Sequence, residues 1–197
     1  LYTGFQTIEA IPYDIIISGS NSTTSTLRLW SSEAQDKFNL QAFNDGDYHQ
    51  AMKTFNEANL ITKVLYPSDN HYQGKELRLK QQYFLVSASI QNIVSEYLKT
   101  HHNILDFPKY VAIHINDTHP ALAIPELIRI LIDKFNLDFN TSLNIAKQTF
   151  SYTNHTVMAE ALERWPSDLI RTKLPRIYII LNQINESFLT EISSLNL

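Results

Sequence analysis

The sequence predicts an α/β fold with a parallel sheet. An apolar run at residues 110–115 is bounded by polar residues, as is typical of a strand buried on both faces. A polar turn follows it, and then an amphipathic helix that begins near Pro125, which together make half of a βαβ unit. A second candidate strand at residues 150–153 is also followed by a polar turn.

The other elements are predicted from turn residues and apolar periodicity. Residues 1–26 are expected to be irregular, because residues 18–26 consist of Ser, Thr, Asn and Gly, and residues 27–30 alternate like a short strand. Helices are expected at residues 48–58 and 75–99, separated by a short apolar stretch at residues 61–66. A helix is expected from a cap at Asn140 or Thr141 through Gln148, and a short one over residues 158–164. Residues 165–167 then break the chain and offer Ser167 as a cap, and Pro175 opens or kinks the final helix.

Composition argues against several classes of function. The net charge of −4, without a basic stripe, argues against nucleic-acid binding. The chain has no cysteine, no secretory leader and no apolar run of membrane-spanning length, so we expect a cytoplasmic protein that does not bind a membrane. Four glycines are few for a self-contained α/β domain, so the ends of the chain are not expected to be natural domain ends.

Two polar turns are the candidate sites of chemistry, because open parallel sheets bind ligands beyond the carboxyl ends of their strands. Residues 116–119 read Asn-Asp-Thr-His and residues 154–156 read Asn-His-Thr, side chains that suit a sugar but also cap helices. No metal or hydrolase motif is present, so the histidines are interpreted as structural or solvated. Five carboxylates could in principle serve as a glycosidase acid and base, namely Asp69, Glu76, Asp117, Glu160 and Glu163. The sequence alone places no two of them at the required separation.

Longer motifs carry a family resemblance. Residues 67–74 read Pro-Ser-Asp-Asn-His-Tyr-Gln-Gly, residues 115–120 read Ile-Asn-Asp-Thr-His-Pro, and residues 152–157 read Tyr-Thr-Asn-His-Thr-Val. With shorter matches at residues 27–31 and 43–48, these segments resemble the glycogen/maltodextrin (α-glucan) phosphorylase family in order and spacing. The resemblance covers nearly the whole chain.

The resemblance implies the GT-B fold, in which two Rossmann-like domains with parallel sheets face a cleft. Residues 1–197 would be an internal fragment from the sugar side of the N-terminal domain. The family transfers the terminal α-1,4-linked glucose of a glucan to inorganic phosphate, and uses the phosphate group of pyridoxal phosphate. The lysine that holds this cofactor has no counterpart here, so no cofactor-binding residue is expected in this chain and the chain alone should be inactive. The expected partners are the glucan, phosphate and the rest of a chain that forms a homodimer.

The resemblance also implies roles for individual residues. His155 would be the catalytic residue, and its ring would hold a sugar hydroxyl. Asn70 and Asp69 would lie on a mobile gate loop at the mouth of the site, where Asn70 would bind a sugar hydroxyl and Asp69 would order the local network. Asp117 and His119 would line the cavity and support His155. Glu126 and Arg78 are interpreted as structural.

Two alternatives stay open at this point. One is a non-catalytic glucan-binding relative, and the other is a generic α/β interaction domain. Joint retention of the four polar residues at positions 69, 70, 117 and 155 favours the enzyme, because a decayed relative is expected to lose at least one.

Overall fold

The computed structural model describes residues 5–20, 22–35, 38–158 and 162–195. The chain divides into two compact units, Leu1–Phe84 and Leu85–Leu197, and helix α3 (Tyr72–Thr100) contributes residues to both. Within the described ranges, no helix combines the length and the apolar character that a membrane span requires.

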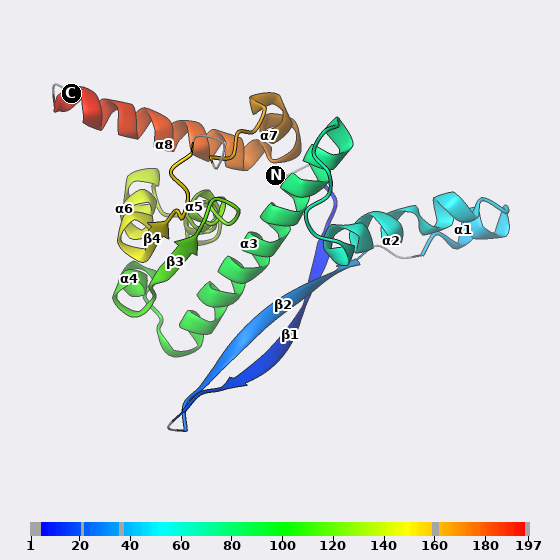
Figure 1. The fold of residues 1–197 in the computed structure, drawn as a ribbon, viewed down its shortest axis with the longest axis horizontal. Coiled ribbons are helices and arrows are strands. Elements are labelled where there is room, and N and C mark those ends of the chain that lie inside the picture. Colours follow the sequence, from blue (N-terminus) through cyan, green and yellow to red (C-terminus); the bar gives the residue numbers. More distant parts are fainter. Residues whose placement is uncertain (1–4, 21, 36–37, 159–161, 196–197) are drawn as a thin grey trace. The chain divides into compact units, whose positions relative to one another are not determined.

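A long antiparallel hairpin opens the first unit, with β1 (Ile8–Ser18) paired to β2 (Thr24–Ala34) (Figure 1). Asp14 lies opposite Arg28, whose Nε and Nη2 donate hydrogen bonds of 2.6 Å to the two carboxylate oxygens. These hydrogen bonds lower the pKa of Asp14. The prediction that residues 1–26 are irregular is therefore wrong for β1 and for residues 24–26, which begin β2. The β-branched residues at 15–17 favour a strand, and the Ser/Thr-rich segment supplies only the turn and the start of β2.

Two helices follow the hairpin, α1 (Leu40–Asn44) and α2 (Tyr48–Lys63). The turn between them places Gly46 at φ 82°, where a side chain would be strained, and Asp47 caps α2 by accepting a hydrogen bond of 3.0 Å from Gln50 N. Helix α2 runs past the predicted end at residue 58. Ile61 lies on the same buried face as Ala51 and Ala58, so the stretch predicted as a separate apolar segment continues the helix.

The second unit is α/β, which confirms the predicted fold class. A parallel pair is formed by β3 (Ile113–Asn116) and β4 (Phe150–Thr153), with Ile113 opposite Phe150 and Asn116 opposite Thr153. Helix α5 (Ala123–Phe135) carries a continuous buried face, with Leu127, Ile128 and Leu131 fully buried. This face packs against α6 (Phe139–Thr149) and α8 (Pro175–Ser194). The remaining elements of this unit are η1 (Ile104–Asp106), α4 (Phe107–Tyr110) and α7 (Ser167–Lys173).

The strand β3 is shorter and more exposed than the sequence predicted. Tyr110 ends α4, and within the strand Ile115 is buried whereas His114 is exposed. Burial on both faces requires covering layers on both faces, and β3 has one neighbouring strand among the described residues. The prediction of two-sided burial is therefore wrong for this chain.

Three helix boundaries also differ from expectation. Asp138 caps α6 in place of Asn140 or Thr141, because its carboxylate accepts hydrogen bonds from the Thr141 N–H and hydroxyl group at 2.9 and 2.6 Å. These bonds lower the pKa of Asp138. Ser167 is the first residue of α7 rather than its cap. The helix predicted at residues 158–164 falls partly on residues 159–161, which lie outside the described ranges, and the residues on either side of them are not helical.

Replacement of Ser32 by Ala should destabilise the first unit. The Ser32 side chain is fully buried, and its hydroxyl group donates a hydrogen bond of 2.7 Å to Ala58 O, which ties β2 to α2. Loss of such a bond should lower the free energy of unfolding by about 1 kcal/mol, as measured by urea denaturation of the chain. Ser25→Ala, at an exposed position of the same strand, is the control and should leave stability nearly unchanged. Equal effects at the two positions would contradict the assignment.

Candidate functional site

The two predicted polar turns lie together at one edge of the parallel pair. They leave the carboxyl ends of β3 and β4, which end side by side because Asn116 pairs with Thr153. The Asp117 N–H donates a hydrogen bond of 2.8 Å to Thr153 O, which extends the contact between the strands beyond the ladder. The expectation that both turns follow the carboxyl ends of parallel strands is therefore confirmed.

A hydrogen bond between His155 and Asn116 joins the two turns directly. The acceptor is the amide oxygen of Asn116, so Nε2 of His155 is the donor. In a neutral imidazole the other nitrogen, Nδ1, is then an acceptor. The exposed His155 ring thus offers Nδ1 to a hydroxyl donor such as a sugar.

Asp117 has an unusual backbone conformation for a residue with a side chain, with φ 70°. Its Oδ1 accepts a hydrogen bond of 2.8 Å from Thr118 N, which ties the carboxylate to its own turn. The left-handed region is open to Asp because its short side chain can bond locally in this way. Its other oxygen, Oδ2, lies 3.9 Å from His119 Nδ1, a pairing that becomes ionic when the histidine is protonated. The structure therefore brings Asp117 and His119 into one turn.

His114 is a part of this edge that the sequence did not reveal. Its ring makes hydrogen bonds to Ser151 Oγ at 3.0 Å and to Thr153 Oγ1 at 2.8 Å, and so links β3 to β4. Thr153 is two residues before His155 in the sequence. Side chains at paired positions of parallel strands share a face, so the signal was present in the alternation of polar residues along both strands. It could be recognised only once the pairing of the strands was known.

The gate-loop residues Asp69 and Asn70 belong to the other compact unit, Leu1–Phe84, and both are exposed. Asp69 accepts a hydrogen bond of 3.0 Å from Arg78 Nη1, which ties the loop to the first half of α3.

Gly74 allows the gate loop to pass close to the start of α3. A Cβ atom at this position would lie 1.7 Å from Ser68 O, so a side chain cannot be accommodated without displacement of the loop backbone. The Gly74 N–H is satisfied by His71 Nδ1 at 3.0 Å. The loop and the first turn of α3 are therefore one closely packed structure.

Metal binding finds no support in the part of the chain that the structure describes. No group of three or more His, Asp or Glu side chains is arranged there to hold an ion. The adjacent His101 and His102 differ in environment, because the ring of His101 stacks on Tyr97 with 4.8 Å between ring centroids, whereas His102 is exposed. The predicted glycosidase candidate Glu160 lies outside the described residues.

The fold and this edge define an α/β protein with a candidate ligand site beyond the carboxyl ends of parallel strands. A family model described as carbohydrate phosphorylase matches residues 1–196, and the chain belongs to that family. It is 47% identical over 198 residues to the muscle form of glycogen phosphorylase from Ovis aries, and 48% identical over 199 residues to the liver form from Homo sapiens. In both cases the match covers 96% of this chain but only 24% of the relative, so the chain spans about a quarter of their length.

Substitutions at Asp117 should separate its backbone role from its charge. Asp117→Asn retains a side chain that tolerates the left-handed region and can still accept from Thr118 N, so its free energy of unfolding should remain close to that of the wild type. Asp117→Ala loses both properties and should be less stable by on the order of 1–2 kcal/mol. Urea denaturation of the three proteins measures this difference. If the Asn and Ala variants are equally stable, the backbone conformation does not require an Asx side chain.

Proposed function

We propose that this chain is the sugar-side part of the N-terminal domain of a GT-B α-glucan phosphorylase. The complete enzyme transfers the terminal α-1,4-linked glucose of glycogen, starch or maltodextrin to inorganic phosphate and forms glucose 1-phosphate. The observation that carries the proposal is the contact between His155 and Asn116 at the carboxyl edge of a parallel pair, in a chain of this family.

His155 is proposed to contact the glucose that is transferred. With Nε2 donating to Asn116, the acceptor Nδ1 is available for a sugar hydroxyl group, and the backbone carbonyl of His155 faces the positive charge that develops at the anomeric carbon. Asp117 and His119 support the turn, and Asn70 binds a further hydroxyl group from the gate loop. A contact that strengthens as charge develops raises turnover rather than ground-state affinity.

Pyridoxal phosphate, which supplies a phosphate group for proton transfer when bound, is proposed to be held elsewhere in the complete protein. Three lysines of this chain pair with carboxylates or an amide on exposed helix surfaces, Lys99 with Glu96, Lys134 with Gln91 and Lys147 with Glu191. These lysines lie on α3, α5 and α6 and not at the two polar turns, so none of them is placed as a cofactor lysine of the candidate site would be. We therefore assign no step through the cofactor to residues of this chain.

The remaining proposals concern the complete protein. We propose that it acts in the cytoplasm, as a homodimer, on a glucan and phosphate. The relatives named above are glycogen phosphorylases, which supports a glucan substrate. The non-catalytic alternative predicts glucan binding by the complete protein without formation of glucose 1-phosphate.

His155→Ala in the complete phosphorylase should lower kcat by on the order of 10²–10³-fold and leave the KM for phosphate nearly unchanged. Loss of the ring removes the hydroxyl contact and the bond to Asn116 that orients the turn. The measurement is steady-state phosphorolysis of maltodextrin with varied phosphate. His102→Ala, at an exposed histidine beyond the end of α3, is the matched control and should turn over like the wild type. Turnover at the wild-type rate in His155→Ala would show that His155 has no role in the reaction.

The 197-residue chain alone should form no glucose 1-phosphate. A phosphorolysis site must hold glucan, phosphate and cofactor together, and loss of this proximity forfeits roughly 7–11 kcal/mol of catalysis. The assay incubates the purified chain with maltodextrin, phosphate and pyridoxal phosphate. Product above that of a heat-denatured sample, or a cofactor absorbance band that survives dialysis, would show that the chemistry resides in this part of the protein.

A further inference from the structure

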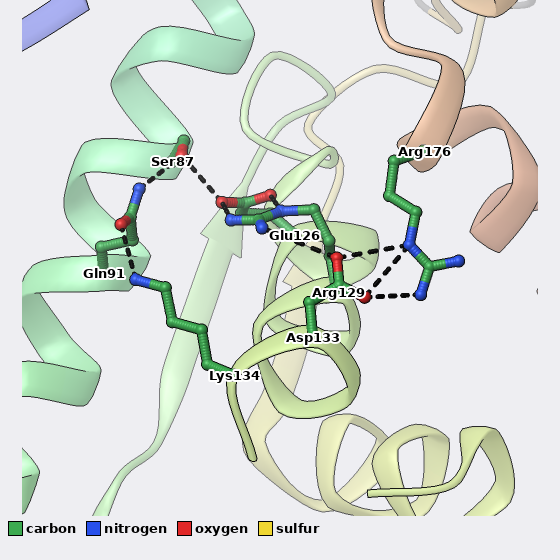
Figure 2. A network of polar contacts seen from close by, with 7 residues as sticks. All are labelled: Ser87, Gln91, Glu126, Arg129, Asp133, Lys134 and Arg176. Atoms are coloured by element: carbon green, nitrogen blue, oxygen red, sulfur yellow. Dashed lines mark hydrogen bonds and ion pairs between the residues drawn. The ribbon is translucent and has the colours of Figure 1, made fainter. Parts of the chain in front are cut away.

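A fully buried carboxylate lies in the first turn of α5, the helix that follows the Asp117 turn. The side chain of Glu126 is 0% exposed. It accepts hydrogen bonds of 2.7 Å from Nε and Nη2 of Arg129 and of 2.7 Å from the hydroxyl group of Ser87 on α3 (Figure 2). A buried charge is costly unless its lone pairs are satisfied, so these bonds restrict Glu126 to one geometry.

The contacts of Glu126 extend to a third helix. Nη1 of Arg129 lies 3.8 Å from Oδ2 of Asp133, whose Oδ1 accepts a hydrogen bond of 2.6 Å from Nη2 of Arg176 on α8. On the other side, Gln91 donates to the Ser87 hydroxyl group at 3.0 Å and accepts from Lys134 at 3.0 Å (Figure 2). The network therefore ties the start of α5 to α3 and its later turns to α8.

An unbroken series of hydrogen-bonded turns connects Glu126 to the polar edge. Ala121 N donates to Thr118 O at 3.0 Å, and Ala123 N donates to Pro120 O at 2.9 Å. Glu126 N donates to Leu122 O at 3.1 Å, which joins these turns to α5. A shift of the first turn of α5 is thus passed along a short, tightly wound segment to residues 117 and 118.

Stability alone does not account for the position of this charge. Replacement of a buried ion pair by apolar side chains of similar volume is often neutral or stabilising, whereas ionic groups can select one arrangement of packed elements. Glu126 lies at the end of α5 that continues the Asp117 turn, while Asp133 lies in the later turns of the same helix and the same network. Substitutions at Glu126 and at Asp133 can therefore distinguish a role in positioning the site from a role in holding the helices together.

We infer that Glu126 is a positioning residue for the proposed glucan site. It holds the first turn of α5 against Ser87 and thereby fixes the Asp117 turn, which follows directly on Asn116, the partner of His155. The inference rests on the proposed phosphorylase function. It assigns to Glu126, which the sequence alone indicates only as structural, a role in positioning the site.

The test compares Glu126→Gln with Asp133→Asn in the complete phosphorylase, at a temperature well below the unfolding of both. Gln retains the shape of Glu126 but sets an amide N–H₂ against a donor of Arg129, so the bidentate pair is lost. Misplacement of a site by about 1 Å can cost on the order of 100-fold in rate. We expect kcat for phosphorolysis to fall between about tenfold and about 100-fold in Glu126→Gln, with the KM for phosphate unchanged, and to stay near the wild-type value in Asp133→Asn.

Ser87→Ala is the second variant, because it removes only the bond from α3 and leaves the ion pair in place. It should lower kcat less than Glu126→Gln does, again without a change in the KM for phosphate, and it carries the test if Glu126→Gln does not fold. Wild-type kcat in both variants, or equal losses in Glu126→Gln and Asp133→Asn, would overturn the positioning role. An inactive wild-type protein would instead overturn the proposed function and, with it, the inference that rests on it.

Discussion

The parallel pairing of β3 with β4 is the constraint on which the candidate site depends. Strands that run in the same direction end at the same edge, and the pairing of Asn116 with Thr153 brings together two turns from distant parts of the sequence. A slip by one residue would send the Asn116 side chain to the other face and separate it from His155. The Asp117 N–H bond to Thr153 O opposes such a slip, because it adds one more contact in the same register just beyond the ladder.

Elements with a strong local signal could be predicted from the sequence, and those that depend on distant partners could not. The apolar stripes of α3, α5 and α8 mark one face at helical spacing, so these helices were found close to their observed bounds. The hairpin was missed because Ser and Thr suit turns and strands alike, and the choice depends on pairing with residues from 6 to 26 positions away, as Ser18 with Thr24 and Ile8 with Ala34 show. Two-sided burial of β3 was predicted from its apolar residues, but burial also requires covering layers, which a single strand does not reveal.

The candidate site shows the same division. Its turns were recognised from their short polar side chains, but the bond between His155 and Asn116 follows from register, which no local pattern specifies. His114 joins the site through Ser151 and Thr153 for the same reason. Glu126 resembles an ordinary first-turn helix acid, a position that normally complements the helix dipole at the surface. Only its complete burial, which results from the packing of several helices, distinguishes it.

The polar edge and the helix that follows it combine local strain at Asp117 with a buried charge at Glu126, and each is costly when taken alone. Asp117 occupies a left-handed conformation that most side chains avoid, and Glu126 keeps a charge out of water. Such costs persist when the surrounding structure holds the group in place, as Thr118 N does for the Asp117 carboxylate and Arg129 does for Glu126. A site that must distinguish hydroxyl groups by hydrogen bonds needs donors and acceptors fixed to within a fraction of an ångström. An apolar replacement for the Glu126–Arg129 pair could leave the free energy of unfolding unchanged, but it would hold α5 by packing alone. Hydrogen bonds restrict the orientation of a helix more sharply than apolar contacts do, because they are directional.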